Sequence, residues 1–271
     1  MSIQKLSYLL QLADNALILG HRISEWTGHG PVLEQDIAIT NTALDHLGQA
    51  RSLYQYAAEL YNQLPPEAQN DFFSSPAFLN HSQAVTEDAL AYLRDAWDFR
   101  NVLLTEQQNG DWAYTIARSF FYDNYSVLLY TALCDSKDAT VAAVAEKSLK
   151  EALYHRRWSS EWVIRLGDGT DESKARMQEA IDERWAFTGE LFTPSEADTA
   201  MLSEGIGADL ASLKSKWTSQ VAEVLAEATL DMPASDAWMQ HGGKQGQHSE
   251  HLGYILAEMQ YMQRAYPGME W

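Results

Sequence analysis

The 271-residue sequence contains a single cysteine, Cys134, which excludes an intramolecular disulfide framework. Only 19 basic residues stand against 38 acidic ones, and the resulting formal net charge of −19 argues against binding to nucleic-acid phosphates. No apolar run approaches the ~20 residues of a membrane span, and no charged-then-apolar leader precedes Tyr8. From these absences we expect a cytoplasmic protein that contacts neither nucleic acid nor membrane.

Alternation of apolar and polar residues with the period of a strand is also missing, whereas helical periodicity covers most of the chain. Long helices are predicted at residues 5–26, 33–61, 111–133 and 139–166. Further helices are predicted at 86–97, 171–192, 196–203, 208–230 and 250–265. Four long helices with shorter ones attached predict an all-α fold, a four-helix bundle with additional C-terminal helices, in a single domain over residues 1–271.

Several residues mark where these helices begin and end. Thr86 and Asp111 are predicted to cap the helices that follow them, and Ser249 is predicted to cap the last helix. Gly167-Asp168-Gly169 stands where a left-handed C-cap is expected.

The segment 33–61 carries two apolar stripes and an unusually polar middle. The first stripe comprises Ile39, Ala43, His46, Ala50, Leu53, Ala57 and Leu60, and the second comprises Ile37, Leu44, Leu47, Tyr54 and Tyr61. The polar middle comprises Asn41, Thr42, Asp45, His46 and Gln49. A buried polar group without a partner costs roughly 1–3 kcal/mol, so these side chains are expected to meet partners at the centre of the bundle.

Di-metal bundles place their ligands at this level, with one carboxylate from each of two helices and Glu-x-x-His from each of the other two. The corresponding positions here are Glu25, His46, Gln49, Asp123, Ala152 and His155, with Asp14 and His21 as less favoured substitutes for Glu25. Neither Glu-x-x-His is intact. Glu151 lies one residue off the required phase, and a side chain rotated by ~100° around the helix is expected to point away from the site. We therefore expect a degenerate ligand frame with no metal and no catalytic residue.

Two interpretations of this frame remain open. In the first, the residues satisfy one another, with Asp123 against His155 or Glu25 against His46. In the second, Glu25, His46, Asp123 and His155 bind one zinc ion, or serve an atypical mono-metal oxidoreductase, because two imidazoles and a carboxylate can make a tetrahedral site.

A second cluster precedes the final helix. Four residues there are candidates for contact with a partner or an anion: Lys244, His248, Glu250 and His251. A glycine-rich, lysine-bearing approach to a helix N-terminus favours anions, although these glycines fit no phosphate-loop spacing. Ser249 before Glu250 predicts that His248 lies outside the helix and off the face of His251.

Runs distributed along nearly the whole chain resemble one known family. They are Asp14-Asn15-Ala16-Leu17, Glu25-Trp26, Leu44-Asp45-His46-Leu47-Gly48-Gln49-Ala50-Arg51, Lys150-Glu151-Ala152-Leu153-Tyr154-His155, Gly242-Gly243-Lys244, His248-Ser249-Glu250-His251-Leu252-Gly253, Leu256-Ala257-Glu258-Met259-Gln260-Tyr261 and Pro267-Gly268. Together they resemble the C subunit of the ring-1,2-phenylacetyl-CoA epoxidase, a bacterial multicomponent monooxygenase.

This resemblance implies a ferritin-like fold and a non-catalytic, structural role. It implies that the di-iron centre lies in a homologous A subunit, which binds phenylacetyl-CoA and pairs with this chain, and that the complex forms the 1,2-epoxide of the ring. It also implies other subunits, including a reductase. A stand-alone ferritin-like binding protein, and self-association of the isolated chain, remain open.

Overall fold

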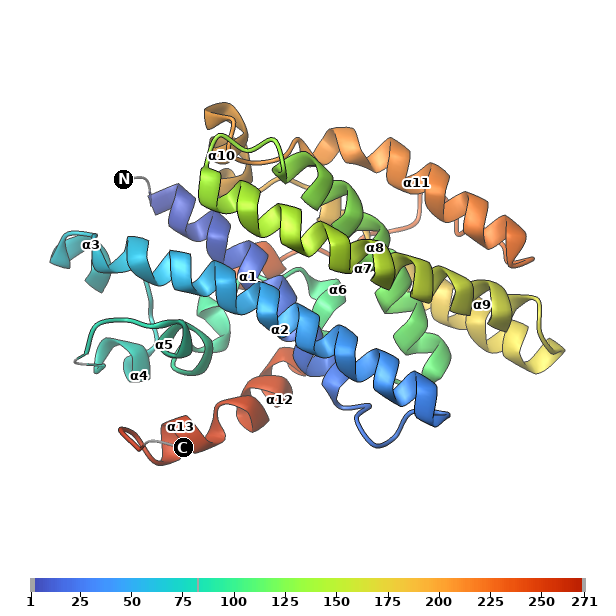
Figure 1. Ribbon diagram of the computed structural model, residues 1–271, viewed down its shortest axis with the longest axis horizontal. Helices are drawn as coiled ribbons and strands as arrows, with labels where there is room; N and C mark the ends of the chain where they lie inside the picture. The colour runs from blue at the N-terminus through green and yellow to red at the C-terminus, as the bar shows by residue number, and fades with distance from the viewer. Residues whose placement is uncertain (1–2, 82, 270–271) are drawn as a thin grey trace.

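The computed structural model describes residues 3–81 and 83–269. These residues form thirteen α-helices and three short 3-10 helices and contain no strand, so the all-α prediction is confirmed (Figure 1). Within the same residues, no helix combines the length and the apolar character that a membrane crossing requires.

Four long helices form the centre of the molecule. They are α1 (Ile3–Ser24), α2 (Leu33–Asn62), α7 (Trp112–Leu133) and α8 (Ala139–Gly167). Helix α1 packs mainly against α2, α7 packs mainly against α8, and contacts between α2 and α8 join the two pairs (Figure 1). Short connections link the helices of each pair, whereas a long crossover connects α2 to α7. Two helix pairs joined by one long crossover are the arrangement of ferritin-like bundles.

The remaining helices lie in the crossover and after the bundle. The crossover contains α3 (Pro66–Asn70), α4 (Pro76–Leu79), α5 (Glu87–Tyr92), η1 (Ala96–Asp98) and α6 (Leu103–Glu106). The C-terminal part contains α9 (Asp171–Trp185), η2 (Gly189–Phe192), α10 (Glu196–Glu204), α11 (Leu210–Glu227), η3 (Gly243–Gln245), α12 (Glu250–Met259) and α13 (Tyr261–Ala265). The predicted helix at 171–192 therefore ends early, and the one at 250–265 is interrupted at Gln260.

The helix ends of the bundle and crossover follow the predicted caps with one exception. The side chains of Thr86 and Asp111 accept hydrogen bonds from backbone N–H groups in the next turn. The left-handed cap expected after α8 is not formed, because Asp168 has φ −95° and Gly169 does not have a positive φ. Gly167 serves close packing instead, since a Cβ at this position would lie 2.3 Å from the carbonyl oxygen of Ala228.

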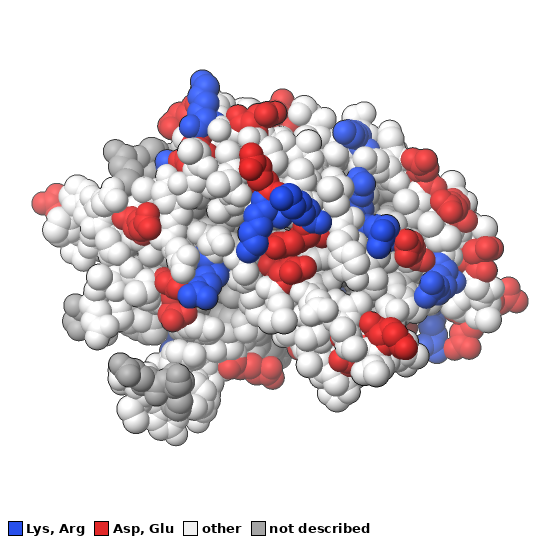
Figure 2. Space-filling view, viewed as in Figure 1, with Lys and Arg blue, Asp and Glu red and all other residues white. Residues whose placement is uncertain are grey.

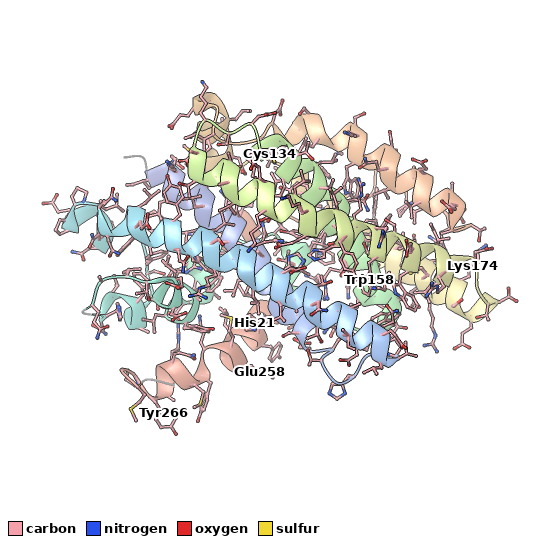
Figure 3. All side chains as sticks on the ribbon, in the orientation of Figure 1. His21, Cys134, Trp158, Lys174, Glu258 and Tyr266 are labelled. Carbon is pink, nitrogen blue, oxygen red and sulfur yellow. The ribbon has the colours of Figure 1, made fainter. Side chains whose placement is uncertain are left out.

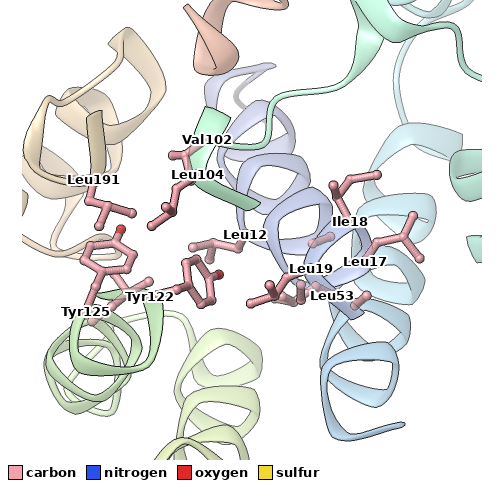
Figure 4. Packing of buried hydrophobic residues seen from close by; sticks show 14 of the residues in the cluster. Leu12, Leu17, Ile18, Leu19, Leu53, Val102, Leu104, Tyr122, Tyr125 and Leu191 are labelled. Atoms are coloured by element: carbon pink, nitrogen blue, oxygen red, sulfur yellow. The ribbon is translucent and has the colours of Figure 1, made fainter. Parts of the chain in front are cut away.

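The buried apolar side chains form a cluster that reaches all four long helices (Figure 4). All residues of the first predicted stripe of α2 are buried. The second stripe is only partly buried, because Ile37 is 53% exposed and Leu44 is 60% exposed. Helix α2 therefore presents apolar side chains to the outside along its N-terminal half.

A buried ion pair fastens the crossover to the bundle. The guanidinium of Arg94, which follows α5, donates from Nη1 to Asp14 Oδ2 at 3.1 Å and from Nη2 to Tyr54 Oη at 2.9 Å. Asp14 also accepts hydrogen bonds from the Tyr54 hydroxyl and from the backbone N–H of Arg100 at 2.7 Å. Arg94 and Asp14 have no exposed surface, and every charge of this cluster has partners.

The C-terminal helices return to the crossover. The Gln260 side chain, which separates α12 from α13, donates from Nε2 to the carbonyl oxygens of Ala91 and Arg94. Arg264 donates to the carbonyl oxygen of Leu93 and pairs with Asp95. These hydrogen bonds satisfy carbonyl groups at and just after the C-terminal end of α5. The segment α12–α13 therefore packs against the crossover and stabilises its short helices.

Candidate functional site

Three side chains meet at mid-length of the bundle, each from a different long helix. His46 of α2, Asp123 of α7 and His155 of α8 are all buried, with at most 2% of each residue exposed. One potential ligand atom from each lies within 4.8 Å of the other two. Because almost no surface of these residues is exposed, the cluster is enclosed by the helices of the bundle. The structure thus brings together three of the six residues of the predicted ligand frame.

Hydrogen bonds are distributed unevenly within this cluster. His155 Nε2 lies 2.9 Å from Asp45 Oδ2, and the side chain of Asp45 is 37% exposed. In contrast, His46 Nδ1 and both carboxylate oxygens of Asp123 are buried without a hydrogen-bond partner. The hydroxyl of nearby Ser159 donates to the carbonyl oxygen of Arg156 at 3.3 Å, and it also lies close enough to Asp123 to oppose the rise of the Asp123 pKa. Buried polar groups without partners are uncommon in folded proteins and call for an explanation.

Burial also changes the protonation of the cluster. Loss of solvation raises the pKa of Asp123 to about 6, against the opposing effect of His155. Burial, reinforced by the charge of His155, lowers the pKa of His46 well below its ordinary value. At neutral pH His46 is therefore a neutral imidazole with an available lone pair.

Next to this cluster, Gln49 takes part in a complete hydrogen-bond chain. Its Oε1 accepts from the Tyr130 hydroxyl at 3.0 Å, and its Nε2 donates to Glu151 Oε2 at 2.9 Å. Glu151 is not among the converging ligand residues, in keeping with its predicted rotation, although its carboxylate reaches Gln49. The glutamate side chain is long enough to reach Gln49 from its rotated position on α8. Ala152, which is buried, has no group that could bind a metal.

Helix α1 places none of its described residues in this cluster. Glu25 lies beyond the end of α1, is 41% exposed at its side chain, and binds Arg22 Nη1 at 2.7 Å and Asn109 Nδ2 at 2.8 Å. The predicted pairing of Glu25 with His46 is therefore wrong. The residue of α1 that faces His46 is Gly20, where a Cβ would lie 3.2 Å from the Cβ of His46.

The two substitutes for Glu25 do not join the cluster either. Asp14 is engaged by Arg94 on the side of the crossover. His21 belongs to α1 but is not among the three residues whose ligand atoms converge.

The direct pairing of Asp123 with His155 is also not formed as a hydrogen bond. Both oxygens of Asp123 lack hydrogen-bond partners, and His155 uses Nε2 for Asp45. Asp45 belongs to the polar middle of α2 but not to the predicted ligand frame. Its position next to His46 is the available signal in the sequence, but only the packing of α2 on α8 shows that it meets His155.

A di-iron centre does not fit these residues. Such a centre needs about four carboxylates to bridge and neutralise two ions, with two histidines. The described residues of the cluster supply one carboxylate, Asp123, and two imidazoles. The remaining frame positions hold an amide, a methyl group and a distant carboxylate, at Gln49, Ala152 and Glu25.

The second candidate cluster lies apart from the bundle centre and is mainly structural. Lys244 is buried, and its Nζ donates to the carbonyl oxygen of Thr193 at 2.9 Å and to Asp198 Oδ2 at 3.0 Å. His248 Nδ1 lies 2.8 Å from Glu106 Oε2, and its Nε2 lies 3.0 Å from the carbonyl oxygen of Phe99. Internal acceptors therefore occupy the side chains of Lys244 and His248, which were candidates for contact with a partner or an anion.

Glu250 and His251 remain accessible to different degrees. Glu250 is exposed, whereas His251 is half-buried and accepts a hydrogen bond from Arg22 Nη2 through its carbonyl oxygen. Both residues line an open cleft of about 480 Å³ together with His241 and His248. Ser249 precedes α12, as predicted, but its side chain makes no capping bond, and His248 lies outside the helix.

The fold and the cluster define a class of protein: a ferritin-like bundle in which the di-metal position lacks its set of carboxylates. The model of the family described as "Phenylacetic acid catabolic protein" matches residues 2–271, and the chain belongs to this family. The chain is similar to the C subunit of the 1,2-phenylacetyl-CoA epoxidase of Escherichia coli (strain K12). The two are 46% identical over 268 residues, which cover 99% of each chain. The resemblance stated from the sequence motifs is confirmed.

Proposed function

We propose that this chain is a non-catalytic, structural subunit of a phenylacetyl-CoA 1,2-epoxidase complex that acts in phenylacetate catabolism. In this proposal the di-iron centre and the substrate site lie in a homologous A subunit, and this chain supports the helices of that subunit. The chain itself holds no di-iron centre, works in the cytoplasm, and assembles with A and with the other subunits of the complex.

The observation that carries this proposal is the composition of the bundle centre. At the level of the ligand frame, Gln49 is held by Tyr130 and Glu151, and Gly20 takes the place where α1 passes His46. Oxygen activation at two irons requires bridging carboxylates that these residues do not provide. The similarity to a relative named as the C subunit of an epoxidase supports the same conclusion.

Exposed apolar side chains on α2 support association with another chain. Leu33, Ile37 and Leu44 are 72%, 53% and 60% exposed, and their spacing places them along one side of the helix. Figure 2, seen from the side on which α2 and α8 lie in front, shows acidic and basic side chains interspersed with uncharged surface. Neighbouring exposed apolar side chains on a charged protein are typical of interfaces.

The test is reconstitution of the epoxidase from separately purified subunits. Oxygen- and reductant-dependent conversion of phenylacetyl-CoA should require both the A subunit and this chain, with iron found in A. Full activity of A and the reductase without this chain would contradict the proposal.

A matched pair of variants tests the proposed surface. Replacing Ile37 and Leu44 together by Glu should abolish co-purification with A, because two charges would enter an apolar contact. Leu202→Glu on α10, where the residue is 43% exposed, is the control and should leave co-purification unchanged. Equal retention of A by both variants would exclude this face of α2 as the contact.

The alternative of a mono-metal oxidoreductase finds less support. Of its four proposed ligands Glu25 is distant from the others, and the remaining three are enclosed by helices. An oxidoreductase needs a substrate next to its metal, and the open cleft beside His248 is lined by other residues than His46, Asp123 and His155.

A further inference from the structure

We propose that His46, Asp123 and His155 bind one divalent metal ion of the zinc type inside the bundle. This inference is independent of the proposed function and departs from the expectation of a metal-free chain. It rests on the convergence of three potential ligand atoms within 4.8 Å and on the lack of hydrogen-bond partners for atoms of two of the three side chains.

The unpartnered atoms are the ones that a metal would use. His46 offers Nδ1, which is buried and accepts no hydrogen bond, and Asp123 offers either carboxylate oxygen. His155 would have to offer Nδ1, because its Nε2 faces Asp45. Two imidazole nitrogens and one carboxylate oxygen form a donor set that zinc accepts, with the fourth position left for water.

The distances permit such a site with small adjustments. For three atoms that lie within 4.8 Å of one another, there is a point no more than about 2.8 Å from any of them. Zinc–nitrogen and zinc–oxygen distances are about 2.0–2.2 Å, so each ligand atom would have to move inwards by less than about 1 Å. Rotation about side-chain bonds supplies movements of this size without any shift of the helices.

Asp45 is not a proposed metal ligand, but its contact with His155 supports the proposed metal site. Metal-binding histidines commonly donate their second ring nitrogen to a carboxylate, which fixes the ring and makes the other nitrogen a better ligand. His155 and Asp45 have this geometry, with Nε2 and Oδ2 2.9 Å apart. The side chain of Asp45 is 37% exposed, so this outer carboxylate is in contact with solvent.

The charge of the ion suits a site with few carboxylates. One divalent ion would be balanced by Asp123 and by Asp45 through His155, whereas two irons would leave several positive charges uncompensated in a buried place. The ion would also give the Asp123 carboxylate and His46 Nδ1 the partners that the protein does not provide.

The experiment is equilibrium dialysis of the full-length chain against zinc after treatment with a chelator, followed by elemental analysis. The wild-type chain should bind one zinc per chain, and Asp123→Asn and His46→Gln should each bind less than a tenth of that amount. Asp45→Asn should retain the site with an affinity about 10–100-fold lower, as expected for a carboxylate that orients a ligand.

Two histidine variants control for zinc bound elsewhere. His21→Gln removes the histidine of α1 labelled in Figure 3, which is not one of the three cluster residues, and His241→Gln removes an exposed histidine of the open cleft. Both should bind one zinc with wild-type affinity. Circular dichroism and thermal unfolding of all variants without zinc would establish that each is folded.

Replacement of zinc by cobalt(II) supplies a second measurement that does not depend on stoichiometry. A four-coordinate site should give the visible absorption of tetrahedral cobalt, and this absorption should be lost in folded Asp123→Asn. Zinc below a tenth of an ion per wild-type chain, iron in its place, or equal binding by the wild type and folded Asp123→Asn would overturn the proposal.

Discussion

Two buried polar clusters of this molecule differ in whether their charged side chains have partners. In the first, Asp14 accepts hydrogen bonds from Arg94, from Tyr54 and from a backbone N–H, so each charge is matched. In the second, Asp123 lies beside His46 and His155, but neither of its oxygens accepts a hydrogen bond. The first cluster is complete within the protein, whereas the second is completed only by protonation or by an added ion.

The difference shows which buried charges support the fold and which are available for another task. A satisfied ion pair joins α1 and α2 to the crossover and needs nothing more. An unsatisfied carboxylate imposes a desolvation cost that the fold must carry. The protein should therefore respond in opposite directions when a charge is removed from each cluster.

The largest effect is expected from Arg94→Met. This change leaves Asp14 buried without its cation, and removing one partner of a buried ion pair typically costs about 3–5 kcal/mol. Urea unfolding should show a loss of stability of this size. The control is Arg51→Ala, which breaks an exposed pair with Glu87 and should cost less than about 1 kcal/mol. Similar losses in both variants would mean that burial does not distinguish the pairs.

A smaller effect, of opposite sign, is expected from Asp123→Asn in protein freed of metal. The pKa of Asp123 is raised from 3.8 to about 6, so the folded chain retains the proton longer than the unfolded chain. The stability that this carboxyl contributes is therefore complete below about pH 4 and is lost as pH rises to about 6. A shift of roughly two pKa units corresponds to about 3 kcal/mol.

The pH profile separates this effect from a general change of stability. Relative to wild type, Asp123→Asn should gain about 3 kcal/mol between about pH 4 and pH 7, as measured by urea unfolding at each pH. A difference that stays constant over this range would show that Asp123 already has an ionic partner, and the contrast between the two clusters would disappear.

The smallest of the three effects is expected from Gln49→Leu. This change leaves the Tyr130 hydroxyl without its acceptor and Glu151 without its donor, which should cost about 1–3 kcal/mol. Gln55→Leu is the control, because Gln55 lies on the same helix and binds Glu87 at the surface. Its effect should remain within about 0.5 kcal/mol. Equal effects would mean that the hydrogen-bond chain of Gln49 does not stabilise the bundle.

The parts of the fold that can be predicted from the sequence are those with a long helical period. Helices α2, α7 and α8 begin within one residue of their predicted starts, because apolar periodicity and the Asp111 cap act locally. The crossover is predicted only in part, since α3, α4 and α6 are four or five residues long and show no period. These short helices depend on distant partners, such as Asp98 for the backbone of Ser74.

The candidate site, like the fold, can be predicted from the sequence only in part. Spacing alone places His46, Asp123 and His155 at mid-helix, and the structure brings them together. Spacing places Glu25 there as well, but α1 ends at Ser24 and the chain turns away at the next residue. The contact of Asp45 with His155 is formed between two residues 110 positions apart. Periodicity within one helix contains no information about such a contact.

The bonds between the C-terminal segment and the crossover have a consequence for synthesis of the chain. The crossover is translated before α7, yet His248 and Gln260 bind Glu106 and Ala91 across 142 and 169 residues. At about 5–20 residues per second, a ribosome needs roughly 7–34 seconds to add the residues between them. During that interval the carbonyl groups at the end of α5 face water or a chaperone. A chain stopped before α12 would therefore present a finished bundle with an open flank, which a quality-control protease could recognise.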